Sequence, residues 1–409
     1  MKPGPVEAKR ICMISHSYYE SDNRIIRYAE ALAERGDRVE VLSLRSSPTL
    51  PASEILNGVL VHRIQDRFGK NESSAWSYLW PLLRFVMVSS RWLAANRRPR
   101  GFDLIHVHNI PDFLVFAAWR EKRRGAKVVL DIHDIVPEFF ASKFNAAPGS
   151  LLVRSLRWVE KASASLADHV ILSNHLWLER YTARSAPAEK CAVFINHVDE
   201  RIFQPQAKVK GGAEGPLIMF PGGLHWHQGL DIAIRAFAIL KREMPEARFH
   251  IYGDGSSKGQ LVALVAELGL DDSVRFFAPM SLRDIARVMA GADLGVVPKR
   301  ADSFGNEAYS TKIMEFMSLG VPVVVSATRV DRHYFNDSVV RFFESGKHEQ
   351  LAQAMVEVLG DAGLRASLVA NSAEYVRRNS WAQNRRRYLQ LVDTLVTRRP
   401  EMAASVRRA

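Results

Sequence analysis

Residues 292–325 constrain the fold more tightly than any other stretch of this sequence. Two apolar runs, residues 294–297 and 321–325, form the ends of this stretch. Each run is short and continuous, which is typical of a strand buried on both faces of a parallel sheet. Pro298 and Gly305 mark a polar loop after the first run. The stretch therefore predicts a strand, a loop, a short helix and a second strand in quick succession.

The helix between these strands is expected to begin directly at the end of the loop. Ser310 or Thr311 can cap it, and Gly320 with Pro322 marks its C-terminal end. The unpaired amides of Thr311 and Lys312, together with the helix dipole, favour an anion in the loop. Diphosphate is the expected anion.

Two glutamates bracket the start of this helix. Glu307 lies in the loop, and Glu315 lies one turn into the helix, between Met314 and Phe316. A carboxylate in so apolar a helix needs hydrogen-bond partners, because burying it without them is costly. Taken alone, the pair is also compatible with a solvated Glu307 and a Glu315 that forms a core ion pair.

Glu307, Glu315 and the run at residues 316–324, Phe-Met-Ser-Leu-Gly-Val-Pro-Val-Val, resemble a motif of the retaining glycosyltransferases of family 4. The resemblance implies the α/β fold called GT-B, with two Rossmann-like parallel-sheet domains facing a central cleft. It assigns Glu315 to the ribose hydroxyls of a nucleotide sugar, and Glu307 to the transferred sugar as a catalytic residue. Many members have Phe-Gly just after the first glutamate, where this chain has Tyr309-Ser310.

The start of the chain reads as a βαβ unit, with a strand at residues 10–15 and a helix at residues 23–35. The loop between them lacks the glycines of a dinucleotide fingerprint, which argues against a nicotinamide enzyme. It resembles the acceptor-side loop of the family, and the resemblance places His16, Asp22 and Arg24 there. A tight turn without special function is the alternative.

Two histidines directly follow predicted strands. Residues 102–107 and 127–132 read as strands, with His108 and His133 next in the sequence. Ligands of parallel sheets collect at the carboxyl ends of the strands. The run Asp131-Ile132-His133-Asp134 resembles family 4, which implies that His133 faces the donor sugar as a catalytic residue, and we place His108 on the acceptor side. A structural histidine with satisfied hydrogen bonds is the alternative.

A second alternation of strands and helices begins at residues 217–220, after a glycine- and lysine-rich linker at residues 206–216. Glycine turns follow its first two strands, and Phe277 ends the strand that would meet the nucleobase in the family. The donor-binding residues expected here are Gly222, Gly223, Gly253 and Phe277.

The expected phosphate site departs from the family pattern. Family 4 enzymes commonly carry an arginine right after the first glycine of this loop and a lysine four or five residues later. This chain has Gly223 and Gln228 at those places. Either other cations neutralise the diphosphate or the protein has lost activity. The expected substitutes are Lys299, Arg300 and Lys312, with His225 and His227 when they are protonated.

The resemblance covers nearly the whole chain and divides it into four parts. A heptad-like apolar face indicates a long C-terminal helix, which crosses back to the first domain in GT-B proteins. The expected parts are an acceptor-binding domain at residues 1–205, a nucleotide-sugar-binding domain at 206–378, the crossover helix at 379–397 and a disordered tail at 398–409.

The composition is that of a globular protein, with 47% hydrophobic and 24% charged residues. Two cysteines, Cys12 and Cys191, form no disulfide framework and indicate a reducing compartment. Residues 75–88 are the most apolar stretch, but they are too few to span a membrane and are interrupted by Pro81 and Arg84. We expect a cytoplasmic protein without a signal peptide.

The formal net charge of +12 would suit nucleic acid, an acidic substrate or an anionic membrane. Nucleic acid is disfavoured, because zinc-finger spacing and RNA-binding aromatic motifs are missing from the sequence. In residues 76–100, Trp80 and Trp92 interleave with Arg84 and Arg91. We expect this segment to contact the inner face of the cytoplasmic membrane as an amphipathic helix, with core packing as the equal alternative.

Together these features predict a retaining glycosyltransferase that moves a sugar from a nucleotide-sugar donor, such as a UDP- or GDP-sugar, to a glycan or a lipid-linked acceptor in cell-surface polysaccharide synthesis. The sequence has no acidic metal-ligand cluster, which agrees with the metal independence of the family, so neither a metal nor another cofactor is expected. Two alternatives are a non-catalytic nucleotide-sugar-binding protein, favoured by Gly223 and Gln228, and a GT-B sugar-nucleotide epimerase.

Overall fold

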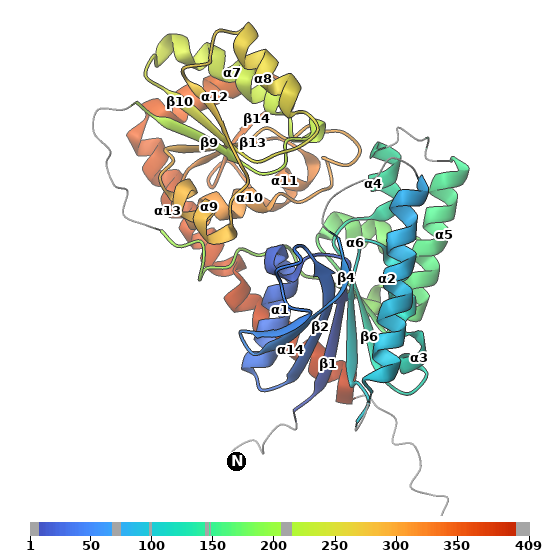
Figure 1. Cartoon of the computed structure of the whole chain (residues 1–409). Coiled ribbons are helices and arrows are strands. Elements are labelled where there is room, and N and C mark those ends of the chain that lie inside the picture. Colours follow the sequence, from blue (N-terminus) through green and yellow to red (C-terminus); the bar gives the residue numbers. More distant parts are fainter. Residues whose placement is uncertain are drawn as a thin grey trace, which may run out of the picture. The chain divides into compact units, whose positions relative to one another are not determined.

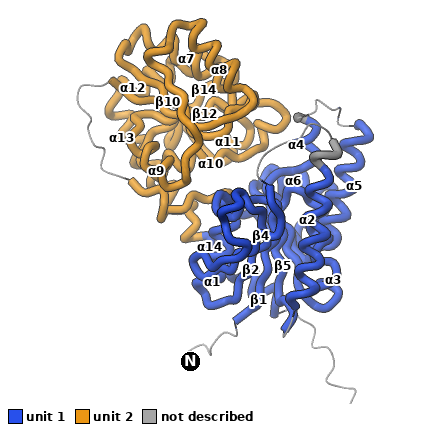
Figure 2. The backbone as a smooth tube through the Cα atoms, viewed as in Figure 1, with its two compact units in different colours: residues 1–195, 384–409 blue, residues 196–383 orange. Residues whose placement is uncertain are grey.

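The computed structural model consists of two compact units, residues 1–195 with 384–409 and residues 196–383 (Figure 2). The first unit ends before the expected boundary at residue 205. Val198 and Phe203 are buried in a core of the second unit, and the Ser318 hydroxyl donates to the Phe203 carbonyl at 2.6 Å. The structure describes residues 8–67, 75–97, 100–143, 147, 149–205 and 215–397, so most of the expected linker and the expected tail at 398–409 lie outside it.

The first unit is built on an eight-stranded sheet in the order β3-β4-β2-β1-β5-β6-β7-β8. All neighbours are parallel except β3 and β4, which form a hairpin. The strands are β1 (Arg10–Ser15), β2 (Arg38–Arg45), β3 (Ser53–Leu56), β4 (Val59–Asp66), β5 (Leu104–His108), β6 (Lys127–Ile132), β7 (His169–Leu172) and β8 (Cys191–Val193).

Helices cover both faces of this sheet. In Figure 1, α1 lies on one side, and α2 and α5 lie on the other. The short helix η2 contacts both α2 and α5, so these three elements form one layer. The elements are η1 (Tyr19–Ser21), α1 (Asn23–Glu34), α2 (Ala75–Ala95), η2 (Asp112–Ala118), α3 (Trp119–Lys122), α4 (Val136–Lys143), α5 (Leu151–Leu166), α6 (His175–Thr182) and η3 (Ala188–Lys190).

The second unit has a six-stranded, fully parallel sheet in the order β11-β10-β9-β12-β13-β14. Its strands are β9 (Leu217–Pro221), β10 (Arg248–Tyr252), β11 (Val274–Phe277), β12 (Leu294–Val297), β13 (Val323–Ser326) and β14 (Arg341–Phe343). Its helices are η4 (Trp226–Gln228), α7 (Leu230–Glu243), α8 (Lys258–Glu267), α9 (Leu282–Ala290), α10 (Thr311–Ser318), α11 (Arg329–Tyr334), α12 (His348–Gly360) and α13 (Ala362–Asn379).

The expected strand, loop, helix and strand of residues 292–325 are present as β12, α10 and β13. Ser310 occupies the N-cap position of α10, but its side chain makes no capping hydrogen bond. Gly320 follows the helix with a φ of 71°, in the left-handed conformation common after helix ends. A Cβ on Gly295 would lie 2.5 Å from the Phe316 ring, so this strand glycine gives α10 room to pack against the sheet.

The C-terminal helix α14 (Trp381–Thr397) begins in the second unit and packs on the first from residue 384 onward. Tyr388 is its buried anchor. The Tyr388 hydroxyl lies 2.9 Å from His106 Nδ1, and its ring centroid lies 4.3 Å from that of Tyr28. Arg35 adds hydrogen bonds to the Leu389 carbonyl and to Asp393 at 3.2 and 2.9 Å.

Replacing this anchor should destabilise the first unit. We expect Tyr388→Ala to lower the free energy of unfolding by about 3–5 kcal/mol, because it removes a large buried ring and leaves a cavity. The exposed Thr394 on the same helix provides the control, and Thr394→Ala should change stability by less than about 0.5 kcal/mol. Chemical denaturation followed by circular dichroism measures both. Equal stability of the two variants would contradict the anchoring role.

Candidate active site

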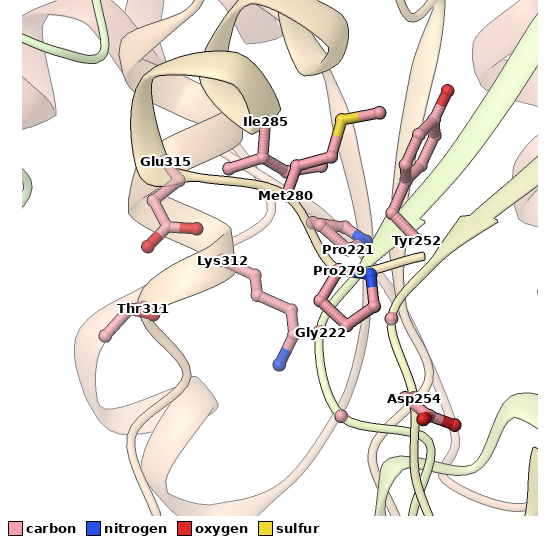
Figure 3. A pocket seen from close by; sticks show the side chains of 12 residues that line it. Pro221, Gly222, Tyr252, Asp254, Pro279, Met280, Ile285, Thr311, Lys312 and Glu315 are labelled. Atoms are coloured by element: carbon pink, nitrogen blue, oxygen red, sulfur yellow. The ribbon is translucent and has the colours of Figure 1, made fainter. Parts of the chain in front are cut away.

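The second unit contains a pocket of about 430 Å³ where the C-terminal ends of β9 and β10 meet the start of α10 (Figure 3). Parallel sheets place their ligands at this edge. The pocket brings together residues from four separate parts of the chain. The predicted donor-binding residues that line it are Gly222, Gly223, Gly253, Thr311, Lys312 and Glu315.

Two glycines at the strand ends allow the backbone to approach the helix closely. Gly222 has a φ of 134°, and a Cβ there would lie 2.4 Å from Lys312 Cε. Gly253 has a φ of 149°, and a Cβ there would lie 1.9 Å from the Gly222 carbonyl oxygen. Both conformations are ones that residues with side chains rarely adopt. A residue larger than glycine at either place would force the backbone or Lys312 out of position.

Lys312 supplies a cation to this pocket. Its side chain extends from α10 toward Gly222 (Figure 3), and its Nζ lies 3.1 Å from Gln228 Oε1. Burial lowers the pKa of Lys312, the nearby Lys299 lowers it further, and Glu315 opposes the shift. An anion bound beside the ammonium would offset the cost of burying this charge.

Glu315 lies one helical turn after Thr311 and lines the same pocket. Its carboxylate favours the charged form of Lys312. The N-terminal amides of α10, the ammonium and the carboxylate therefore lie within a single pocket, which combines an anion-binding end with a hydrogen-bond acceptor.

An aromatic pair forms another part of the pocket's surroundings. Tyr252 lines the pocket, and its ring stacks on that of Phe277 with centroids 4.5 Å apart and 11° between the planes. Phe277, which was predicted to bind the donor, is not among the lining residues. Sequence reasoning missed Tyr252, although its place at the end of β10, directly before Gly253, was a usable signal.

Two of the three expected substitute cations have other partners. The Lys299 ammonium lies 3.0 Å from Asp331 Oδ2 and donates to the Ala308 carbonyl at 2.6 Å. The Arg300 guanidinium lies 2.5 Å from Asp231 Oδ2 and 3.5 Å from the centroid of the Trp226 ring. Neither side chain lines the pocket. Of the three expected cations, Lys312 is the one that lines the pocket.

Of the two histidines near the pocket, His227 is a poor source of charge. The rings of His225 and His227 are nearly parallel, with centroids 5.9 Å apart. Burial lowers the pKa of His227, and His225 and Lys312 lower it further. His227 therefore stays neutral at a pH where an exposed histidine would begin to gain a proton.

Glu307 lies in the loop between β12 and α10 and is buried, with 5% of its surface exposed. One carboxylate oxygen lies 3.9 Å from Arg329 Nη1. Glu307 does not line the pocket that contains Glu315. The structure thus separates the two glutamates of the motif, with Glu315 at the proposed nucleotide end and Glu307 in the neighbouring loop.

In the first unit, Asp131 is the centre of the predicted histidine cluster. Arg24 donates to both of its carboxylate oxygens, at 2.8 and 2.7 Å. His108 Nδ1 and His133 Nε2 lie 3.1 and 3.2 Å from Asp131 Oδ2. Burial alone would raise the pKa of Asp131, but Arg24 and the histidines hold it well below its usual range. Arg24, His108 and His133 thus surround one ionised carboxylate.

His133 is the member of this cluster that reaches the surface, with 19% of its side chain exposed. His108 is fully buried, and burial lowers its pKa although Asp131 opposes the shift. His106, His108 and Asp131 are residue types that bind metals, and their ligand atoms lie within 4.8 Å of one another. A metal ion there would have to displace Arg24, which holds both oxygens of the carboxylate.

The other two acceptor-side predictions have local contacts. Asp22 caps α1 by accepting from the Ile25 amide at 3.3 Å, and it also accepts from the Ser17 hydroxyl at 3.0 Å. The His16 ring packs edge-on against Phe85, with centroids 5.2 Å apart. Burial lowers the pKa of His16 to about 4, so the ring is neutral at physiological pH.

Two family models match successive parts of this chain. The model described as "Glycosyl transferase 4-like domain" matches residues 22–197, and the model "Glycosyl transferases group 1" matches residues 203–375. D-inositol 3-phosphate glycosyltransferases of Thermobispora bispora and Jonesia denitrificans are 27% and 26% identical over 379 and 382 residues. These alignments cover 88% and 87% of this chain, and 86% and 87% of the relatives.

Solved structures share the fold. Sucrose-phosphate synthase from Thermosynechococcus elongatus has a TM-score of 0.76 at 19% identity, covering 95% of this chain and 99% of that one. HepE from Anabaena, in complex with UDP and glucose, has a TM-score of 0.72 at 18% identity, covering 95% and 100%. With a group 1 domain following a 4-like domain and two parallel-sheet units in the GT-B arrangement of elements, this chain belongs to family 4 of the glycosyltransferases.

Proposed function

We propose that this glycosyltransferase transfers a sugar, with retention of configuration, from a nucleotide-sugar donor to a glycan or a lipid-linked acceptor in cell-surface polysaccharide synthesis. The observation that carries the donor assignment is the pocket in which Lys312, Glu315 and the amino end of α10 lie together. Solved structures of the fold relative HepE contain UDP, and one contains UDP-glucose. A UDP-sugar is therefore the first donor to test.

The proposed donor site stabilises charge on the leaving diphosphate. Breaking the bond between the sugar and the diphosphate builds negative charge on the leaving oxygen, so fixed positive groups near it lower the barrier. The Lys312 ammonium and the amides of Thr311 and Lys312 are such groups. Glu315 would accept from the ribose hydroxyls, and His133 and Glu307 would contact the transferred sugar.

Lys312 replaces, in this proposal, the cations that the family usually places after the first glycine turn. Its ammonium lies 3.1 Å from the side-chain oxygen of Gln228, where the family usually has lysine. A lysine side chain at position 228 would thus lie close to the position that the Lys312 ammonium occupies. One helix-borne lysine can supply the charge that the loop lacks.

Neutralising Lys312 should weaken binding of UDP but not of uridine, because its charge acts on phosphate. We expect Lys312→Met to raise the dissociation constant for UDP about 10- to 100-fold, as for the loss of a charged hydrogen bond. Burial lowers the pKa of Lys312 from its ordinary 10.5, so the side chain loses its charge at a lower pH than an exposed lysine does. The affinity for UDP should therefore fall as the pH is raised toward 10.5. Calorimetry measures each affinity.

The exposed Lys347 provides a matched control for this prediction, since Lys347→Met removes the same charge from the same unit. Gln228→Lys in the Lys312→Met background should restore UDP binding. An equal loss for uridine and UDP would show that Lys312 shapes the pocket instead of binding phosphate.

The proposed function is tested with a panel of UDP- and GDP-sugars, scoring thermal stabilisation and release of the nucleoside diphosphate. Glu315→Gln should weaken nucleotide binding itself, about 10- to 100-fold, because it removes a charged acceptor. Glu307→Gln and His133→Ala should bind the nucleotide with unchanged affinity. Their turnover should be slower, so less nucleoside diphosphate is released from the donor in a given time. Unchanged affinity for Glu315→Gln would contradict its assignment to the ribose. Failure of every donor with the unaltered protein would contradict the proposed function.

We also propose that the first unit contacts an anionic membrane, which would bring the enzyme to a lipid-linked acceptor. Most of the exposed large apolar side chains lie on the layer formed by α2, η2, α3 and α5. The acidic residues of these elements, Asp112, Glu121 and Glu160, are all buried. The exposed apolar residues are Leu79, Trp80, Met87, Phe116, Trp119, Leu151, Leu152 and Trp158, and the exposed basic residues include Arg84, Arg91, Arg120, Arg154 and Lys161.

The structure revises which parts of residues 76–100 belong to this surface. Trp92 packs against His62 and Phe102, with ring centroids 4.7 and 6.4 Å apart, and is not an exposed side chain. The side chain of Trp76 lies outside the described part of the chain. In the proposed surface, exposed residues of α3 and α5 join those on the outer side of α2 and take the place of Trp76 and Trp92. Within the described residues, no helix is long and apolar enough to cross a membrane.

Vesicle flotation tests this contact. Binding should require anionic lipid, such as phosphatidylglycerol mixed with phosphatidylcholine, and should fall with added salt, because each basic residue near the surface contributes about 1 kcal/mol and is screened. Trp80→Ala combined with Trp158→Ala should reduce recovery. Ile55→Ala is the control, since Ile55 is 72% exposed, as Trp158 is, but lies on β3. Equal recovery with neutral vesicles, or an equal effect of Ile55→Ala, would refute the proposed surface.

A further inference from the structure

A buried ion pair lies beside the loop that carries Glu307, outside the donor pocket. Lys299 follows Pro298, the first residue after β12, and its Nζ lies 3.0 Å from Asp331 Oδ2. The two side chains are only 5% and 0% exposed. Removing two charges from water costs several kcal/mol per ion, and their attraction repays this only with good geometry and further hydrogen bonds. The additional contacts of the pair indicate what it does.

Lys299 uses its second hydrogen bond to hold the Glu307 loop. Its ammonium donates to the carbonyl of Ala308, the residue after Glu307, at 2.6 Å. A charged donor makes a shorter and stronger bond to a carbonyl than a neutral one. Ala308, which follows Glu307, is thus held by the side chain of Lys299 just after β12.

The residue on the other side of Glu307 is attached to α11. The Asn306 carbonyl accepts from the Val330 amide at 2.9 Å, and its side-chain oxygen accepts from the Arg329 amide at 3.1 Å. Glu307 is therefore held through both of its neighbours, one bound to Lys299 and one bound to the start of α11.

Asp331 joins these two attachments. It lies in the first turn of α11, where its amide donates to the Thr328 hydroxyl at 3.3 Å and that hydroxyl donates to Asp331 Oδ2 at 2.5 Å. The carboxylate that neutralises Lys299 therefore belongs to the same helix start that holds Asn306. Loss of either charge would loosen the loop and leave the other charge buried without its partner.

We propose that Lys299 and Asp331 are positioning residues for sugar transfer, which hold Glu307 in place through the Ala308 carbonyl and the start of α11. This rests on the proposed role of Glu307 at the transferred sugar. It also gives Lys299 a function different from that of Lys312, although both lysines flank the same loop. Lys312 acts on the donor phosphate, and Lys299 acts on the loop.

Hydrogen–deuterium exchange tests the attachment without requiring activity. Within the loop, the amides of Glu307 and Ala308 both donate to the Phe304 carbonyl, at 3.0 and 2.9 Å. Peptides covering these amides should exchange faster in Lys299→Met and in Asp331→Asn. The control is Arg332→Met, which removes a neighbouring cation of α11 whose partner is the exposed Asp337 at 2.7 Å. Unchanged exchange in both test variants, or an equal change in the control, would overturn the attachment.

Kinetics separate positioning from phosphate binding. With the UDP-sugar that the wild-type protein turns over, Lys299→Met should keep the UDP dissociation constant within about twofold. Its kcat should fall about 100-fold, because a displacement of about 1 Å can cost that much. Lys312→Met should instead weaken UDP binding. Weakened UDP binding in Lys299→Met would overturn the proposal, as would an unchanged kcat.

Failure of the proposed function and failure of the positioning role would give different results. If the wild-type protein turns over no nucleotide sugar, the proposed function fails, whereas the exchange experiment still decides whether Lys299 and Asp331 hold the loop. If Lys299→Met does not fold, Asp331→Asn decides the question, since it keeps the size of the side chain and should change exchange and kcat in the same direction.

Discussion

The close approach of the Gly222 backbone to the Lys312 side chain joins the end of β9 to the start of α10 at the pocket. Side chains at Gly222 and Gly253 would collide with Lys312 and with the Gly222 carbonyl, at 2.4 and 1.9 Å. Because both residues are glycine, the end of β10 can approach Gly222 closely, and Gly222 can approach the Lys312 side chain. The amides of α10, the ammonium of Lys312 and the carboxylate of Glu315 then meet in one pocket.

Three cations near this pocket differ in the partners of their charged groups. Lys299, Arg300 and Lys312 lie within fourteen residues of one another in the sequence. Asp331 neutralises Lys299, and Asp231 neutralises Arg300. Lys312 has the uncharged amide oxygen of Gln228 as its hydrogen-bond acceptor and faces the pocket. Since a buried ammonium is costly without compensation, Lys312 is the member of the three best suited to gain from a bound anion.

The sequence predicted the regular parts of this structure and missed contacts between distant residues. Buried strands and their helices are visible as local apolar patterns, so residues 292–325 were assigned correctly. The end of the first unit was placed too late, because nothing in the pattern of residues 196–205 shows that Val198 and Phe203 pack into the second core. The orientation of the Lys299 side chain depends on its ion pair with Asp331, which lies 32 residues later in the sequence. No local sequence pattern indicates such a pairing.

The cluster around Asp131 connects the predicted sugar-facing histidine to the C-terminal helix. Arg24 neutralises the buried carboxylate, which leaves its oxygens as acceptors for His133 and His108. The His108 ring stacks on His106 with centroids 4.2 Å apart, and His106 Nδ1 lies 2.9 Å from the Tyr388 hydroxyl. The second ring nitrogens of His106 and His108 have no hydrogen-bond partner among the described residues, so ring stacking is the link between the two histidines. The cluster that contains His133 is thus in contact, through these stacked rings, with α14, the last described helix of the chain, which begins in the second unit and is anchored in the first by Tyr388.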